Sequence, residues 1–232
     1  MSKADFHIHT PFCDGKSTPE EIIHEALSKG YEAVGFSGHS YTFFDESYCM
    51  SRENTVLYKK LIGELKAKYR GKLSVFCGVE QDFYSKEPTD GYDYVIGSVH
   101  YVLKNGSYLP VDYNKNVLKK AVIDFYDGDI YALIEDYFRT VSAIQSADFI
   151  GHFDVISKFN EDGSLFSESN GRYKRAASAT IEKLIKIPFE INTGAMAKGY
   201  RTSPYPSDRI LKEIRSLGGS IIFSSDCHNS EK

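Results

Sequence analysis

The sequence predicts an α/β fold in which a parallel sheet closes into a distorted (β/α)7 barrel. Seven short apolar segments alternate with helix-like or loop segments along the 232 residues, and no low-complexity linker separates them. In runs such as "SIIF" (220–223) the apolar residues are consecutive, which is typical of strands buried on both faces of a parallel sheet. With 41% hydrophobic residues the chain can fill a core, so we expect one domain over residues 1–232.

The first half of the chain predicts four strands and two helices. Thr18 or Ser17 can cap a helix within residues 17–30, Pro19 fits its first turn and Gly30 ends it. A second helix is predicted within residues 51–71. The predicted strands are "ADFHIH" (4–9), "EAVGFSGH" (32–39), "KLSVFCGVE" (72–80) and "YDYVIGSVH" (92–100).

The second half resumes this alternation after an interruption. Asn105-Gly106 between apolar residues predicts a hairpin within residues 101–114. The predicted helices are 115–126, 129–146, 172–186 and 207–219, and the predicted strands are 147–154, 187–194 and 220–228. No helix follows to cover the last strand, so we expect the natural protein to be longer than this sequence.

Composition excludes several classes of protein. A net charge of −4 argues against a nucleic-acid binder. The sequence contains no run of about 18 apolar residues, so it predicts no membrane-spanning helix. The N-terminus lacks the basic and apolar regions of a signal peptide, which indicates a cytoplasmic protein. The four cysteines form no C-x-x-C pair, so we expect reduced structural thiols.

Histidines concentrate where the predicted strands end. Six of the seven occupy such positions, whereas His24 lies in a predicted helix and serves as an internal control. Because the carboxyl ends of barrel strands form one rim, these side chains are expected to meet in one cleft. The rim histidines are His7, His9, His39, His100, His152 and His228, and the acidic residues beside them are Glu80, Glu190 and Asp226.

His7 and His9 raise the metal hypothesis directly. Alternate residues of a strand point the same way, so both imidazoles can grip one ion. A single H-x-H is weak evidence, and Glu80 alone is as well explained as a salt-bridge partner. The combination of six histidines with Glu80 and Asp226 on one rim favours a metal site.

At this point the residues resemble the PHP (polymerase and histidinol phosphatase) superfamily. The segments "DFHIHT", "FSGHS", "GVE", "GSVH", "GHFD" and "SSDCH" look like its successive motifs. The segments "HIHTPFCDG" and "EINTGA" are most similar to its histidinol-phosphatase branch, whose enzymes hydrolyse L-histidinol phosphate in histidine biosynthesis. The resemblance implies a distorted (β/α)7 TIM-like barrel of the PHP type with two or three divalent metals: zinc, manganese or iron.

The resemblance also implies the ligands. The first metal would take His7, His9, Glu80 and Asp226, and the second would take Glu80, His100 and His152, with Glu80 as the bridge. The third would take His39 and His228. Many relatives carry a further histidine after H-x-H, but this chain has "CDGKS" there, so Asp14 is the expected substitute.

The expected reaction is hydrolysis of a phosphomonoester by a hydroxide that bridges two metals and attacks phosphorus. Asp226 or His228 would protonate the leaving oxygen. Arg201 is the first candidate for the substrate phosphate because a guanidinium fork matches phosphate oxygens, and Lys158 is the second. For each, a solvated loop cation is the plain alternative.

Three other functions stay open on the sequence. A PHP enzyme could act on a nucleotide or another small phosphate ester, or on DNA as an exonuclease, which the acidic balance disfavours. A catalytically silent metal-binding module is disfavoured by the intact rim residues. Metal-dependent amide hydrolysis would need further ligands, such as a lysine, that we cannot place.

Overall fold

The computed structural model describes residues 3–230, and its contacts divide them into two compact units. The first unit holds the residues up to Gly97, Ser146–Asp148 and those from Phe223 onward. The second holds Ser98–Gln145 and Phe149–Ile222. The strands of the parallel sheet follow the order β1-β2-β3-β4-β7-β8-β9, so neighbours in the sheet are also successive parallel strands along the chain.

The first unit begins with four predicted strands of the sheet. They are β1 (Ala4–Asp5), β2 (Ala33–Phe36), β3 (Ser74–Asp82) and β4 (Tyr94–Ser98). β1 pairs with β2 and β2 with β3 in parallel, with Val34 opposite Asp5 on one side and Val75 on the other. β1 is shorter than predicted, because from Ile8 onward the chain bridges to Cys227 near the other end of the sequence.

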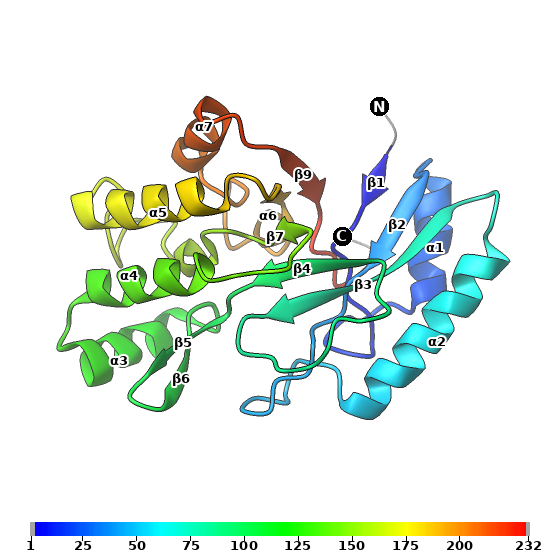
Figure 1. Cartoon of the computed structure of the whole chain (residues 1–232), viewed down its shortest axis with the longest axis horizontal. Coiled ribbons are helices and arrows are strands. Elements are labelled where there is room, and N and C mark those ends of the chain that lie inside the picture. The colour runs from blue at the N-terminus through cyan, green and yellow to red at the C-terminus, as the bar shows by residue number, and fades with distance from the viewer. Residues whose placement is uncertain (1–2, 231–232) are drawn as a thin grey trace. The chain divides into compact units, whose positions relative to one another are not determined.

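Two amphipathic helices cover these strands (Figure 1). They are α1 (Pro19–Ser28) and α2 (Arg52–Lys68). The predicted start of α1 is confirmed: Thr18 Oγ1 accepts the amide hydrogen of Glu21, whose carboxylate accepts that of Thr18. Their apolar faces form one buried core with the strands, including Ile23, Phe36, Met50, Tyr58 and Ile62.

Tyr94 fills the space beside the strands of this unit. Its hydroxyl donates to the carbonyl of Phe6 at 2.7 Å and lies 3.2 Å from that of Phe36. A Cβ atom at Gly78 would lie 2.2 Å from the Tyr94 ring, and one at Gly35 would lie 2.4 Å from its hydroxyl. Both strands therefore need glycine where this ring crosses them.

The second unit starts with the predicted hairpin. β5 (Tyr101–Lys104) and β6 (Ser107–Pro110) pair antiparallel with Lys104 opposite Ser107. Asn105 and Gly106 both have positive φ, as a type I′ turn requires.

Helices and short strands make up the rest of the second unit. α4 lies between α3 and α5 (Figure 1). α4 ends at Val141 and not at residue 146 as predicted, because the chain turns there and Ser146 has a positive φ, which a helix does not allow. The elements are α3 (Lys115–Tyr126), α4 (Ile130–Val141), β7 (Phe149–Ile150), the 3-10 turn η1 (Val155–Ser157), α5 (Gly171–Leu184), β8 (Phe189–Asn192), α6 (Gly194–Ala197) and α7 (Asp208–Ser216).

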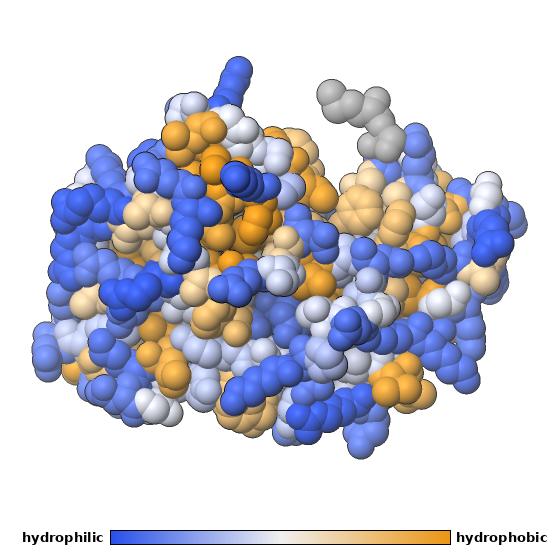
Figure 2. Space-filling view, viewed as in Figure 1, coloured by the Kyte–Doolittle hydropathy of each residue, from blue (hydrophilic) through white to orange (hydrophobic). Residues whose placement is uncertain are grey.

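The last strand, β9 (Ile221–Ser224), has one uncovered apolar face. Ile221 is 46% exposed and Phe223 63% exposed, and Figure 2 shows apolar surface over this strand. None of the helices in residues 3–230 is long and apolar enough to cross a membrane.

Candidate metal centre

The four side chains expected at the first metal meet in the first unit. His7 Nε2 lies 3.3 Å from Glu80 Oε2 and 3.8 Å from Asp226 Oδ1. His9 Nε2 lies 3.5 Å from the same Glu80 oxygen and 3.3 Å from Asp226 Oδ1. His7, His9 and Glu80 are buried. The expectation that His7 and His9 face the same side is confirmed.

These separations suit ligands of one shared ion. Two ligand atoms that each lie about 2.1 Å from a zinc ion at a tetrahedral angle are about 3.4 Å apart. The four separations in this group run from 3.3 to 3.8 Å. Two imidazoles and two carboxylates at such spacing fit a divalent ion without a change of fold.

The carboxylate of Asp14 lies close to three histidines, His9, His39 and His228. Asp14 Oδ2 lies 3.2 Å from His228 Nε2, and its Oδ1 lies 3.7 Å from His39 Nε2 and 3.6 Å from His9 Nδ1. The rings of His9 and His228 stack with centroids 4.1 Å apart. The structure therefore brings Asp14 to the residues expected at the third metal.

Burial and neighbouring charges together shift the pKa values of His9 and Asp14. The His9 pKa falls to about 3, because burial disfavours the imidazolium and His228 and His39 add like charge. Burial opposes ionisation of Asp14, but its neighbouring histidines outweigh this effect and hold its pKa below the usual range. Neutral imidazole and ionised carboxylate are the forms that bind metals.

Strand pairing explains how His39 reaches the cluster. His39 follows β2 and forms a parallel bridge with Glu80 of β3. Its Nδ1 lies 2.8 Å from Glu80 Oε2, and the ring of Tyr48 meets its other side edge-on at 4.8 Å. Glu80 was expected at the end of its strand, but β3 continues to Asp82. The bridge to His39 places Glu80 inside the ladder.

The remaining two histidines lie together in the second unit. The rings of His100 and His152 are 5.0 Å apart, and both residues are buried. The backbone N–H of His152 donates to Glu190 Oε2 at 2.6 Å, and the same oxygen accepts from Asn192 Nδ2 at 3.0 Å. The expectation that His100 and His152 share a metal with Glu80 stays a prediction.

Comparison with known proteins identifies the family. A family model described as the PHP domain matches residues 5–194. The chain belongs to the PHP domain family. The segment that carries Asp226 and His228 lies beyond the matched residues, so their assignment depends on the geometry above.

Relatives of this PHP domain extend over nearly its whole length. The histidinol-phosphatase of Bacillus subtilis is 30% identical over 99% of this chain and 95% of the relative. A Listeria monocytogenes structure, named as a candidate histidinol phosphatase, aligns with a TM-score of 0.80 at 20% identity over 99% of this chain and 96% of that one. The histidinol phosphate phosphatase of Lactococcus lactis was solved with zinc, L-histidinol and phosphate. It aligns with a TM-score of 0.73 at 19% identity, over 100% of this chain and 88% of that one.

The structural likeness confirms the predicted fold class. The PHP domain is a mixed α/β fold with a parallel sheet of seven strands, and its chain follows the fold of these solved structures. At these identities the solved structures establish the fold and leave the chemistry to the residues of this chain.

The two cations expected to meet the phosphate are both engaged within the second unit. Arg201 is only 8% exposed, and its Nη1 donates to the Ser157 carbonyl at 3.2 Å and to the Ser157 hydroxyl. Its Nε lies 3.8 Å from Glu161 Oε2 and has no hydrogen-bond partner among the described residues. Lys158 Nζ lies 3.2 Å from Asp112 Oδ2. The solvated loop cation considered for Arg201 is therefore wrong.

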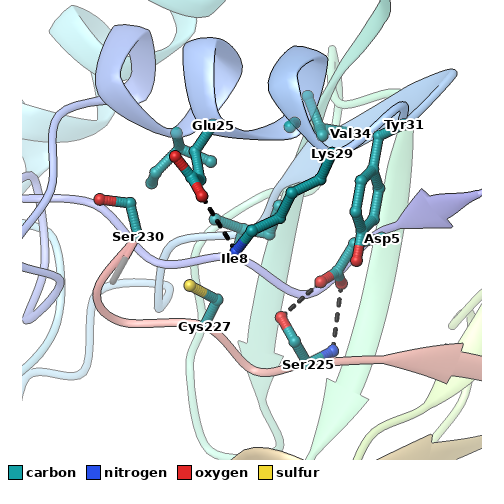
Figure 3. Close-up of a pocket in the computed structure, with 11 residues that line it drawn as sticks. Asp5, Ile8, Glu25, Lys29, Tyr31, Val34, Ser225, Cys227 and Ser230 are labelled. Carbon is teal, nitrogen blue, oxygen red and sulfur yellow. Dashed lines mark hydrogen bonds and ion pairs between the residues drawn. The ribbon is translucent and has the colours of Figure 1, made fainter. Parts of the chain in front are cut away.

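Sequence reasoning missed two carboxylates that accept hydrogen bonds from the backbone of candidate ligands or of their neighbours. Asp5, at the end of β1, accepts hydrogen bonds from the backbone of His7 and from Ser225, and Figure 3 shows the contact with Ser225. Glu190 was noted only as a residue at the end of a strand. A usable signal was spacing, since Asp5, His7 and His9 alternate along one segment.

His24, the histidine expected to lie outside the site, does so. His24 is exposed on α1, and its Nε2 lies 3.0 Å from the Tyr69 hydroxyl. Within residues 3–230 no disulfide forms among the four cysteines, as expected, and Cys13 Sγ lies 3.6 Å from His9 Nδ1.

Proposed function

We propose that this PHP domain is a metal-dependent histidinol-phosphatase that hydrolyses L-histidinol phosphate to L-histidinol and phosphate. The observation that carries the proposal is the buried group of His7, His9, Glu80 and Asp226, whose donor atoms have the spacing of ligands around one ion. The 30% identity with the Bacillus subtilis histidinol-phosphatase over 99% of this chain supports the substrate.

The proposed ligand sets follow the two groups of the first unit and the histidine pair of the second. His7, His9, Glu80 and Asp226 hold one ion, Asp14, His39 and His228 hold another, and Glu80, His100 and His152 hold the remaining one. Zinc, manganese and iron all suit such donors. When bound, divalent ions supply a hydroxide nucleophile at neutral pH and neutralise charge on the phosphate oxygens.

Protein side chains complete the reaction. The alkoxide that leaves phosphorus needs a proton, which we assign to Asp226 or His228, directly or through water. Asp226 Oδ1 lies 3.4 Å from His228 Nδ1, and this nitrogen is 2.9 Å from the Asp226 carbonyl, so the two candidate acids are neighbours. Both compact units belong to one proposed metallophosphatase domain, because the family match runs through both. The free thiols fit a cytoplasmic location, which is reducing.

A phosphate-release assay tests the function. The protein, loaded in turn with zinc, manganese or iron, is offered L-histidinol phosphate beside a panel of nucleotide and sugar phosphates and single-stranded DNA. We expect L-histidinol phosphate to give the highest kcat/KM. Preference for another ester would contradict the substrate, and metal binding without turnover of any ester would indicate a silent binding module.

Arg201 is proposed to bind the substrate phosphate, with its remaining N–H donor capacity as the support. Arg201→Ala should leave the metal content unchanged and lower kcat/KM about ten- to a hundredfold, because a charge-assisted contact contributes about 1.5–3 kcal/mol. Arg201→Lys should recover only part, since an ammonium lacks the planar fork. Unchanged kcat/KM in Arg201→Ala would transfer the role to Lys158, for which Lys158→Ala is the matched variant.

A further inference from the structure

The carboxylate of Asp5 connects two segments that are far apart in sequence. Asp5 is buried, and its Oδ1 accepts the backbone N–H of His7 at 3.1 Å and that of Ser225 at 3.2 Å. Its Oδ2 accepts the Ser225 hydroxyl. Figure 3 shows both contacts with Ser225 at the edge of a pocket beside α1. One side chain thus receives three hydrogen bonds from the two segments.

Both segments carry proposed metal ligands. The amide of His7 belongs to a ligand itself, and Ser225 directly precedes Asp226. Asp226 Oδ1 faces the two nitrogens of His7 and His9 at 3.8 and 3.3 Å. The hydrogen bonds of Asp5 therefore end at His7 itself and at Ser225, the residue next to Asp226.

Asp226 needs such support because of its backbone. Its φ is +51°, in the left-handed region that non-glycine residues rarely adopt. On its C-terminal side, Cys227 is fixed by hydrogen bonds between its N–H and the carbonyl of His7 at 3.1 Å and between its carbonyl and the N–H of His9 at 2.8 Å. On its N-terminal side, Ser225 is fixed by Asp5. The unfavourable conformation is held from both sides.

The surroundings of Asp5 assign it to hydrogen bonding and not to an ion pair. Lys29 is the one cation among the residues that line this pocket. Its Nζ pairs with Glu25 at 3.1 Å, as Figure 3 shows. The hydrogen bonds that the Asp5 oxygens accept from the described residues all come from N–H or O–H donors.

We propose that Asp5 is a positioning residue for the metal centre: it holds His7 and Asp226 in the geometry in which they bind one ion. The inference rests on the proposed metal centre and is independent of the substrate. Loss of a residue that orients metal ligands without touching the ion typically weakens metal binding about 10- to 100-fold.

Zinc titration of the full chain tests this role without any substrate. Protein freed of metal is dialysed against buffered zinc, and bound zinc is counted by elemental analysis. We expect Asp5→Ala to bind the zinc of the first group about 10- to 100-fold more weakly. Asp5→Asn keeps one oxygen able to accept both amides, so it should recover most of the affinity. Ser225→Ala removes only the hydroxyl donor and should lose about 2- to 10-fold.

Asp93→Ala is the matched control. Asp93 also accepts a backbone N–H across the sheet, from Cys77 at 2.8 Å, but neither residue adjoins a proposed ligand. Asp93→Ala should therefore lower the melting temperature and leave the zinc affinity unchanged. Unchanged zinc affinity in Asp5→Ala, or in Ser225→Ala should Asp5→Ala not fold, would overturn the proposal. Equal losses in Asp5→Asn and Asp5→Ala would assign the effect to charge and would overturn it too.

The phosphate-release assay on the same samples separates the two levels of inference. Weaker zinc binding in Asp5→Ala together with no wild-type turnover of L-histidinol phosphate would keep the positioning role and reject the proposed substrate. Normal zinc binding in Asp5→Ala together with full wild-type turnover of L-histidinol phosphate would reject the positioning role and keep the proposed substrate.

Discussion

His9 presents both of its ring nitrogens to carboxylates. Nε2 faces Glu80 and Asp226, whereas Nδ1 lies 3.6 Å from Asp14 Oδ1. A neutral imidazole binds a metal through one nitrogen and donates its proton from the other. Asp14 can therefore act as a ligand beside His39 and His228, or as the acceptor that orients His9.

Asp14→Ala distinguishes these roles. As a ligand, Asp14 should take one ion with it, so the variant should bind one zinc fewer while the sites of His7 and Glu80 stay filled. As an orienting group only, all sites should remain, with zinc at His9 bound about 10- to 100-fold more weakly. Anomalous diffraction counts the occupied positions, and full occupancy at every position would remove Asp14 from the proposed ligands.

One carboxylate oxygen of Glu80 lies close to three histidine rings. Its Oε2 lies within 3.5 Å of a ring nitrogen of His7, His9 and His39. Glu80→Gln keeps the size and removes the charge. We expect loss of at least one metal and a fall in kcat of about a thousandfold or more, since a bridged pair supplies both nucleophile and charge stabilisation.

Metal content and turnover of Glu80→Gln are measured on the same preparation. Glu25→Gln, which changes a glutamate of the α1 surface, should retain both. Full metal content with near-normal turnover in Glu80→Gln would refute a bridging carboxylate.

At the scale of elements, Asp93 joins a helix to two strands. It precedes β4, receives both contacts of Lys66 Nζ from α2 at 2.7 and 2.8 Å, and accepts the N–H of Cys77 in β3. Burial opposes its ionisation, but Lys66 and the Cys77 amide outweigh burial and lower its pKa below the usual value. The carboxylate form is thus favoured in the folded protein.

This shift predicts a pH dependence of stability. Because the folded pKa is depressed, the contribution of Asp93 is fully present above the unfolded value of about 3.9 and is lost as pH falls through the folded pKa. Asp93→Asn should therefore lower the free energy of unfolding at pH 7 by about 1 kcal/mol. The difference from wild type should shrink below pH 4.

Urea unfolding of the metal-free proteins at pH 7 and at pH 3 measures this difference. Asp124→Asn, which alters an exposed pair with Lys120 within α3, should change little at either pH. A difference between Asp93→Asn and wild type that is equal at both pH values would show that the ionised form is not what stabilises these elements.

For the whole molecule, local chemistry decided which elements sequence could predict. The cap at Thr18 and the turn at Asn105-Gly106 depend on residues within a few positions, and both are confirmed. β1 is shorter than predicted because Ile8 bridges to Cys227, a partner that no local pattern reveals.

The candidate site divides in the same way. Strand alternation predicted that His7 and His9 face one side, and the family resemblance grouped them with Glu80 and Asp226, with which they do converge. The left-handed backbone of Asp226 and the contact of Asp5 with Ser225 depend on tertiary structure that no spacing predicts. The same is true of Arg201, whose burial follows from its contact with Ser157, 44 positions away.

Metal removal should affect the stability of the whole chain. Without an ion, the carboxylates of Glu80, Asp226 and Asp14 surround His9 with no divalent charge to neutralise them. An ion present at 100 times its dissociation constant stabilises the folded state by about 2.7 kcal/mol per site, which for a chain of this size raises the melting temperature by about 5–10 °C. A chelator should therefore lower the melting temperature by at least this amount, and zinc should restore it. The shift should be smaller in Glu80→Gln, which has fewer sites to empty, and unchanged in Glu25→Gln. Equal melting temperatures with and without chelator, in protein shown to have lost its metal, would contradict a metal centre within the folded core.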